Sequence, residues 1–386
     1  YRWSDYSQGY STDTYKLAGD WSPTDDFRFR ASYNRAVRAP NVVELFATAN
    51  VQLNGLTDPC EGDDPTFTLE QCMRTGVTAA QYGNIAPNLA GQYNGLVGGN
   101  PDLVPETSDT VSFGLVLTPR FLPGFNMSVD WFNIQVEDRI GQIGQDTILQ
   151  RCADTADAFL CGLINRAPGT GSLWLGSNGY IVDTTFNTGK LEVEGVDIEA
   201  NYRFDFGDFA ATRALDSFGG MSFNFQGSYL KDYLVTSLPG DDPFDCAGLY
   251  GSICTGSATT ASAPLPKWRH KLRATWRAPW DLELSGTWRY IDSVKVDAKI
   301  PGSGPTHAQG PDAKLAAQSY FDIAANWAVR DNVSIRFGVN NVFDNDPPMV
   351  GSGGTAINNC PSGPCSGNTF PQTYDSLGRY LFFGVR

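Results

Sequence analysis

Eight cysteines are the residues of this 386-residue chain with the clearest capacity for covalent chemistry. They lie two to a segment in four segments without strand-like patterning, and no Cys-x-x-Cys spacing occurs. Their even number and paired placement favour one bond within each segment, in an oxidising compartment. We therefore predict four disulfide bonds, each closing a short loop: Cys60–Cys72, Cys152–Cys161, Cys246–Cys254 and Cys360–Cys365.

Catalytic and metal-binding chemistry has little support. A hydrolytic site needs a nucleophile, a base and an orienting group together, and a metal site needs clustered ligands. The chain has two histidines, of which His270 falls on an apolar strand face and His307 in a Gly/Pro-rich loop. Acidic clusters at 58–64 and 241–245 could bind Ca²⁺ or be solvated loop tips, and they lack EF-hand spacing. We predict no enzyme activity, no metal and no cofactor.

Charge and hydropathy narrow the class of protein further. The formal net charge of -14 argues against a nucleic-acid partner, which would need a concentrated basic surface. The chain contains no long apolar run and its mean hydropathy is -0.27, so transmembrane helices are excluded. A transmembrane β-barrel is still compatible, because alternation dilutes its hydropathy signal.

A strict alternation of apolar and polar residues indicates strands. In the segment 27–34, Phe27, Phe29, Ala31 and Tyr33 point one way while the arginines and other polar residues point the other way. The pattern recurs about ten more times, without a helical period between strands. It slips at Trp131-Phe132, where we predict a bulge, and the run 180–204 is predicted to kink at Thr188-Gly189.

Short turns and long connections alternate along the chain, which places all the long connections at one end of the sheet. The long connections are predicted at about 36–105, 137–178, 236–266, 296–315 and 344–373, and they contain all the cysteines. Outer-membrane barrels have short periplasmic turns, long extracellular loops and apolar outward faces. We therefore predict an all-β fold, a transmembrane antiparallel β-barrel with about eleven strands in this chain.

Two groups of residues at the loops are candidates for ligand binding. The loop aromatics Tyr82, Tyr93, Trp174 and Tyr180 could stack on sugar rings or on a siderophore catechol, or they could pack the loops against each other. Arg38, in the segment with Asn41 and Glu44, is either a rim contact for a substrate or an anchor for the following loop.

A basic row is predicted on the polar face of the strands. Its members are Arg28, Arg30, Arg269, Arg273, Arg289 and Arg336. They could guide an anionic substrate, or they could belong to a wet lumen wall that pairs with acidic residues.

Five segments in this order resemble the C-terminal barrel half of TonB-dependent outer-membrane receptors. They are RASYNRAVRAPNVVELF (30–46), NPDLVPETSDTVSFGL (100–115), VDWFNIQVEDRI (129–140), GVNNVFDNDP (338–347) and YDSLGRYLFFGVR (374–386). The resemblance implies that residues 1–386 are part of a 22-stranded barrel whose lumen holds an N-terminal plug. The chain ends at Val385-Arg386 and not on the aromatic residue usual in this family, unless Phe383 takes that role.

The same resemblance implies a function and a location. Such receptors lie in the outer membrane of Gram-negative bacteria, contact its lipid, and take up scarce nutrients such as iron chelates, cobalamin or oligosaccharides. The plug transmits energy from the TonB complex of the inner membrane. We expect the plug and about ten more strands upstream of this chain, and no energy-coupling residue can be assigned within it.

Three alternatives are compatible with the pattern. A passive porin or complete barrel of about 12 strands would begin just before Tyr1. A surface adhesin would lack TonB coupling. A soluble β-sandwich or lectin would use the aromatic rows as the core between two sheets.

Overall fold

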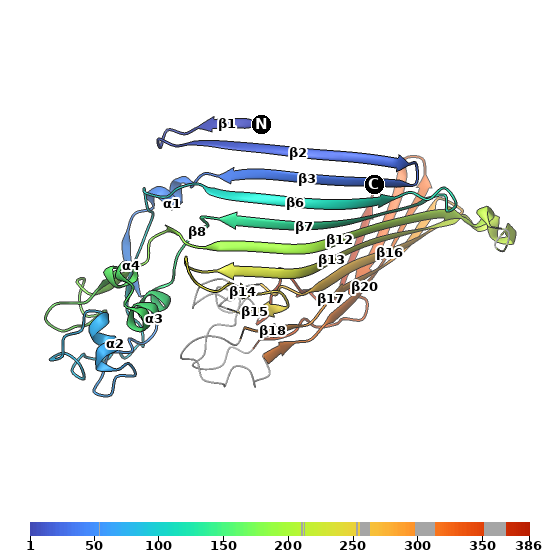
Figure 1. Cartoon of the computed structure of the whole chain (residues 1–386). Coiled ribbons are helices and arrows are strands. Elements are labelled where there is room, and N and C mark those ends of the chain that lie inside the picture. The colour runs from blue at the N-terminus through green and yellow to red at the C-terminus, as the bar shows by residue number, and fades with distance from the viewer. Residues whose placement is uncertain are drawn as a thin grey trace.

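The computed structural model describes the chain from Tyr1 to Arg386 except residues 54, 210, 212, 252–253, 255–262, 298–312 and 351–367. Its main element is one long antiparallel sheet, drawn in Figure 1 as a stack of strands from blue to red. The strands of its continuous path are β1 (Arg2–Asp5), β2 (Ser11–Thr24), β3 (Phe27–Arg38), β6 (Glu106–Leu117), β7 (Phe125–Glu137), β12 (Lys190–Asp205), β13 (Gly220–Thr236), β16 (Trp268–Ala278), β17 (Leu282–Ile291), β20 (Gln318–Arg330), β21 (Val333–Asn340) and β22 (Tyr380–Val385).

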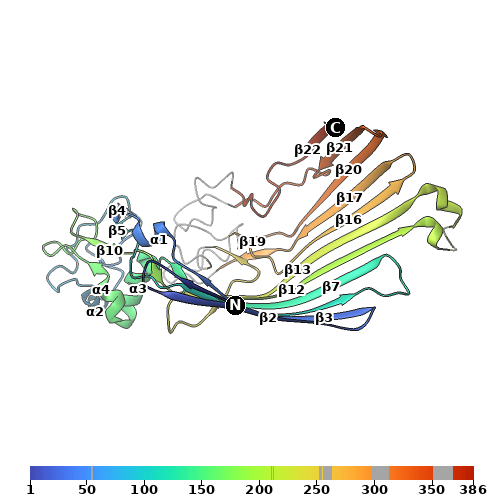
Figure 2. The ribbon, with the colours of Figure 1, turned by 90° about the horizontal axis from the view of Figure 1, so that it is seen from above.

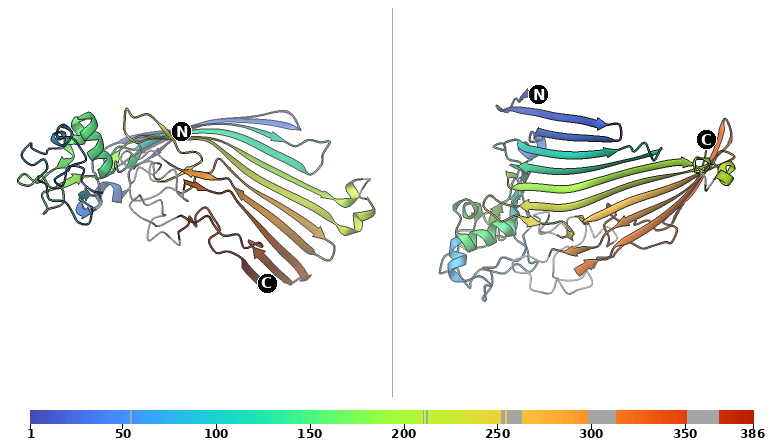
Figure 3. Two further views of the ribbon diagram at one scale, coloured as in Figure 1. Left: turned by 90° about the horizontal axis from the view of Figure 1, so that it is seen from below. Right: turned by 45° about the vertical axis from the view of Figure 1, so that its right-hand side comes forward.

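This sheet confirms the predicted all-β antiparallel architecture. Its path has twelve strands in the described part of the chain, slightly more than predicted, and β14 (Phe244–Asp245) pairs with β13 beside it. The order of strands in space is their order along the chain, as expected for an up-and-down wall. Figures 2 and 3 show from above and below that the wall is curved, with β1 and β22 at its two edges.

The remaining elements are short and lie mostly in the connections. They are α1 (Val42–Phe46), β4 (Asn50–Leu53), α2 (Leu69–Arg74), β5 (Asn94–Val97), β8 (Ile140–Gly141), α3 (Gln145–Thr155), α4 (Ala158–Gly162), β9 (Ile164–Asn165), β10 (Tyr180–Val182), β11 (Phe186–Asn187), η1 (Phe206–Asp208), η2 (Arg213–Phe218), β15 (Leu249–Tyr250), β18 (Val294–Val296) and β19 (Lys314–Leu315). Among the described residues, none of the helices combines the length and the apolar content needed to cross a membrane.

The long connections all leave the same end of the wall, as predicted (Figure 1). Their bounds are 39–105, 138–189, 237–267, 292–317 and 341–379, so the second, fourth and fifth connections are longer than the alternation alone indicated. The second connection is longer than expected because the run 180–204 is interrupted: β11 ends at Asn187 and β12 begins at Lys190, which confirms the break at Thr188-Gly189.

The two faces of the wall differ as the alternation predicts. On the face that we call outward, cross-strand partners are apolar, for example Phe29, Leu115, Val129 and Ile198 on four successive strands. The opposite, inner face is polar. There Asn224 donates an amide hydrogen bond to Asn201 (2.6 Å), and Asn201 donates one to Asn126 (3.1 Å). Strands with this period can face two different surroundings at once.

The predicted bulge at Trp131-Phe132 is wrong. The ladders of β7 with β6 and with β12 run through these residues without a shift, and the register shift lies instead between Glu194 and Gly195, where β12 pairs with β13. The apolar residues change face at this point: Trp131 is outward, whereas Phe132 and Ile134 are on the inner face. What looked like an extra residue in the sequence is a change in which face is apolar.

A glycine on β6 makes room for an ion pair across the inner face. Arg30 on β3 and Asp130 on β7 form a bidentate pair over Gly114, with 2.7 Å between Arg30 Nε and Asp130 Oδ1. A Cβ atom at Gly114 would lie 2.1 Å from Asp130 Oδ1 and 2.6 Å from Arg30 Nε. Any side chain at this position must therefore displace the pair.

We predict that Gly114→Ala lowers the stability of the barrel by about 0.5–1 kcal/mol because it forces the partly exposed Arg30–Asp130 pair apart. The matched control is Gly286→Ala on β17, where an added Cβ has no atom within 4 Å. That control is expected to be neutral or slightly stabilising, since alanine restricts the unfolded chain. Urea unfolding of both variants in detergent micelles measures the difference, and equal midpoints would contradict this account.

Candidate ligand-binding loops

The connections 39–105 and 138–189 fold into one body, which we call the loop unit. Strands from both connections form a small sheet in the order β4-β5-β10-β9, and β5 and β10 run parallel within it. A shared hydrophobic core contains Tyr93 from the first connection and Ile148, Leu149, Leu173 and Ile181 from the second. The loop unit therefore has a core of its own beyond the end of the wall (Figure 1).

A buried ion pair joins the two connections. Arg166 and Asp58 have side-chain exposures of 3% and 1%, and their bidentate contact has distances of 2.6 and 3.0 Å. The guanidinium also donates to the carbonyl oxygens of Thr75 (3.2 Å) and Gly171 (2.9 Å). A desolvated charge pair is tolerated only when its remaining hydrogen-bonding groups are satisfied, as they are here.

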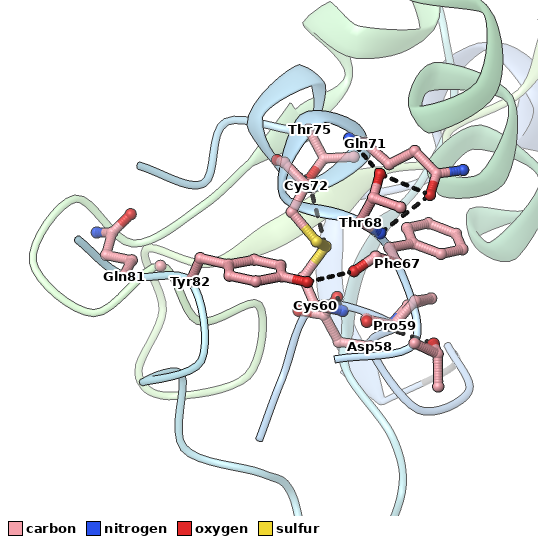
Figure 4. The surroundings of a disulfide bond; sticks show 12 residues. Asp58, Pro59, Cys60, Phe67, Thr68, Gln71, Cys72, Thr75, Gln81 and Tyr82 are labelled. Atoms are coloured by element: carbon pink, nitrogen blue, oxygen red, sulfur yellow. Dashed lines mark hydrogen bonds between the residues drawn. A yellow bond between two sulfur atoms is a disulfide. The ribbon is translucent and has the colours of Figure 1, made fainter. Parts of the chain in front are cut away.

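Three of the four predicted disulfide bonds are present, namely Cys60–Cys72, Cys152–Cys161 and Cys246–Cys254. Cys360 and Cys365 lie outside the described residues. Figure 4 shows the first bond beside α2, with the Tyr82 hydroxyl donating to the Phe67 carbonyl oxygen (2.9 Å). In the chain-entropy view each bond contributes about 2–3 kcal/mol, which helps to hold the loops in one shape.

The aromatic residues predicted at the loops have different environments. Tyr93 is fully buried and its hydroxyl donates to Asp146 Oδ1 (2.6 Å), so the structure assigns it to packing inside the loop unit and not to a ligand surface. Tyr82 is partly buried and packs against the hydrophobic cluster that contains Cys60 and Cys72. Trp174 and Tyr180 are half-buried, and Trp174 donates from Nε1 to the carbonyl oxygen of Ala86 (3.0 Å).

Arg38 anchors the start of the loop unit. It pairs with Glu106 on the neighbouring strand (2.6 Å) and with Glu44 in α1 (2.9 Å). Glu44 also accepts from the backbone of Asn41, and the Asn41 side chain accepts from the backbone of Glu44, which forms a capping box. These contacts favour the anchoring role over the rim contact with substrate.

Two acids, the buried Asp183 and the half-buried Asp146, lie near the start of α3. Asp183 accepts a hydrogen bond from the Gly144 N–H (3.1 Å), and Asp146 accepts from the Leu56 N–H (3.0 Å). Burial raises the pKa of Asp183 to about 6, and burial likewise raises the pKa of Asp146. The described residues contain no group of three or more His, Cys, Asp or Glu able to hold a metal ion.

The third connection, 237–267, covers part of the inner face of the wall. The cysteine pair Cys246–Cys254 packs against Val235, Leu191 and Tyr233 of β12 and β13. Arg151 of α3 forms an ion pair with Asp241, so this connection also touches the loop unit. A separate cluster around Tyr250, Phe370 and Tyr374 connects the third, fourth and fifth connections.

The basic row lies on the inner face, and most of its members have partners. Arg28 contacts Asp20 (3.7 Å), Arg289 pairs with Asp322 and Asp375 (both 2.8 Å), Arg273 donates to Ser285 (3.1 Å), Arg336 lies over the Phe382 ring (5.1 Å), and Arg269 is the ladder partner of Ser228. Arg273 and Arg336 line an open groove of about 500 Å³ close to the short-turn end of the wall.

A family model described as "TonB dependent receptor-like, beta-barrel" matches residues 1–342. The chain belongs to the TonB-dependent receptors. Barrels of this family lie in the outer membrane, and the family consists of transport receptors and not of enzymes. No curated protein matches the chain.

Solved receptors have the same fold. The siderophore receptor PirA from Acinetobacter baumannii is 17% identical, with a TM-score of 0.59 over 99% of this chain and 42% of that chain. A mutant of the ferric enterobactin receptor PfeA from Pseudomonas aeruginosa, in complex with enterobactin, is 16% identical, with a TM-score of 0.58 over 99% of this chain and 41% of that chain. The chain thus spans about two fifths of these receptors, and identities this low show the fold alone.

Sequence reasoning did not find the contacts that hold the loop unit together. Asp58 stood out only as one of several acids, and Arg166 lies 108 residues further along the chain. Nothing in the sequence marked Asp183 as unusual, because its raised pKa comes from burial of the residue between β10 and β11. No local pattern marks a partner at such a distance.

We predict that Arg166→Ala destabilises the loop unit by about 3–5 kcal/mol, because Asp58 is then left buried without its counter-charge. The matched control is Arg120→Ala, which removes an exposed ion pair with Asp25 and Asp26 at the other end of the wall and should cost less than about 1 kcal/mol. Hydrogen exchange of the α3 amides measures the free energy of opening. Unchanged exchange in Arg166→Ala would show that the pair does not hold the two connections.

The raised pKa of Asp183 predicts that acid stabilises the loop unit. The folded pKa of about 6 lies above the ordinary value of 3.8, so the folded state binds the proton more tightly and stability rises as pH falls from 7 towards 4. Between pH 7.5 and pH 5 the gain is about 1 kcal/mol. Asp183→Asn should remove this part of the pH dependence of α3 amide protection factors, and a variant with the wild-type pH dependence would contradict it.

Proposed function

We propose that this protein is an outer-membrane active transport receptor that binds a scarce nutrient at its loops and imports it with TonB-derived energy. The observation that carries the proposal is the match to the TonB-dependent receptor barrel over residues 1–342. The nutrient would be an iron chelate, cobalamin or an oligosaccharide. The partners would be the membrane lipid, an N-terminal plug and, through it, the TonB complex.

The organisation of the loops supports capture of a ligand. A disulfide-tied loop unit with its own core loses little conformational freedom on binding, which improves affinity. Its aromatics Trp174, Tyr180 and Tyr82 are half-buried, and Trp174 and Tyr82 also pack against hydrophobic clusters of the loop unit. We propose Trp174 and Tyr180 as the first residues to test for ligand contact.

The inner face supports a polar lumen next to a plug. The groove beside Arg273 and Arg336 is also lined by Glu283, Ser285 and Asn326. Paired arginines in a wet wall are ordinary in wide barrels, so we assign the basic row to the lumen or plug surface and not to substrate selection.

Uptake by cells that carry the full-length receptor tests this function. Siderophores with bound iron, cobalamin and oligosaccharides are supplied with and without a functional TonB complex. Active transport predicts uptake of one ligand class that ceases without TonB. Uptake that continues without TonB would indicate a passive porin-like barrel, and binding without any uptake would indicate a surface adhesin.

We predict that Trp174→Ala weakens binding of the imported ligand about fivefold, through loss of an aromatic face worth about 1 kcal/mol. Trp174→Phe is the control, because it keeps a ring and loses only the Nε1 hydrogen bond to Ala86. If Trp174 acts by packing alone, both variants should raise hydrogen exchange in the loop unit with no change in affinity. Unchanged affinity in Trp174→Ala removes it from the binding surface.

A further inference from the structure

The outward face of the wall changes from apolar to polar before the strands end. On β12, Val196, Ile198 and Ala200 alternate as an apolar row, and the outward positions above them are Glu194 and Glu192. On β7 the same change lies between Trp131 and Asn133. The sheet ladder continues across it, so the backbone is unaffected and only the surroundings that suit the side chains differ.

The polar residues above the change form a connected band. Asn133 donates to Glu192 (3.1 Å), and Lys231 pairs with Glu194 (2.8 Å). On β3 and β6, Arg35 and Tyr33 both bond to Asp109, at 2.9 and 2.7 Å. A band with both signs of charge, on a face that is apolar lower down, suits water or lipid headgroups and not hydrocarbon.

Trp131 lies where the outward face changes from apolar to polar, and its side chain contacts both regions. Its ring stacks on Phe113 within the apolar rows, at 5.7 Å between centroids. Its Nε1 donates to Glu194 in the polar band (2.9 Å). An indole with one apolar and one hydrogen-bonded end is typical of the border between hydrocarbon and headgroups.

The change does not follow a row of ladder partners. Val111 and Asn133 face each other directly on β6 and β7, and one is apolar while the other is polar. Further along the wall the change lies between Phe321 and Ser319 on β20. Ladder partners connect Phe321, strand by strand, to Phe27 on β3. Phe27 lies six residues before Tyr33, the last residue of the unbroken apolar outward row of that strand, which ends at Arg35.

This displacement has the size that strand tilt requires. Six residues over the seven steps from β3 to β20 give nearly one residue per strand. With a rise of about 3.3 Å per residue and a strand spacing of about 4.8 Å, the line is inclined by about 30–35° to the rows. Strands in outer-membrane barrels are tilted by about 35–45°, so a level plane would cross this wall along nearly the same diagonal.

We propose that the outer boundary of the hydrocarbon layer follows this diagonal line, and that the upper ends of β12 and β13 stand clear of it. The outward side chains Lys190, Glu192, Glu194, Lys231 and Asp232 then contact the polar headgroup layer of the outer leaflet. This inference rests on the membrane location within the proposed function and is independent of ligand and of TonB.

Spin labels at single cysteines in the full-length receptor, reconstituted in liposomes, test the line. Collision with oxygen reports hydrocarbon and collision with a water-soluble nickel chelate reports water. The first pair is Val111→Cys and Asn133→Cys, which are ladder partners. The second pair is Leu115→Cys and Ser319→Cys, which share one row across the wall. The native cysteines in the described bonds do not react with the label.

The expected result is a several-fold higher ratio of oxygen to nickel collisions at Val111→Cys than at Asn133→Cys, and at Leu115→Cys than at Ser319→Cys. Equal ratios within both pairs would place the boundary along a ladder row and overturn the proposal. If one variant fails to assemble, the other pair decides. High nickel accessibility at all four positions would overturn the membrane location itself, whereas loss of uptake with the expected ratios would leave this inference intact.

Discussion

Backbone hydrogen bonding between neighbouring antiparallel strands is the interaction on which the rest of this structure depends. Each strand of the wall between its edge strands β1 and β22 is paired on both sides, so the N–H and C=O groups within the wall find partners inside the sheet. A barrel wall in a membrane has no water to satisfy them otherwise. Once this ladder is fixed, side chains must alternate between two faces, and the sequence can adapt each face to different surroundings without altering the backbone.

The loops face a different problem, because they cannot use the ladder of the wall. The connections 39–105 and 138–189 instead build a small core, a mixed sheet and a buried ion pair. Disulfides add constraints where the hydrophobic core is small. The loops thereby keep a defined shape, which the proposed capture of a ligand would require, and the wall serves as their rigid base through anchors such as Arg38.

Much of the wall could be predicted from local pattern, because a period of two and the alternation of short and long connections are visible in any window of residues. The disulfide pairs were predictable for a similar reason, since each pair is near in sequence. The role of Tyr93 was not, nor was the Arg166–Asp58 pair, because burial inside the loop unit depends on segments about a hundred residues apart. The polarity of nearby residues does not show whether a loop aromatic stacks on a ligand or packs inside the loop unit.

The bulge was predicted wrongly because the apolar residues of β7 lie on the outward face in one part of the strand and on the inner face in the other. Below Trp131 the outward residues of β7 are apolar, as a membrane wall requires. Above it the inner residues Phe132, Ile134 and Val136 are apolar, and on the neighbouring strands Leu191 and Tyr233 lie under the third connection. That upper part follows the rule of a soluble sheet, with its core beneath the loops and its charges outside. A single strand therefore passes from one solvent to another by exchanging the roles of its two faces, while its hydrogen-bonded register stays constant.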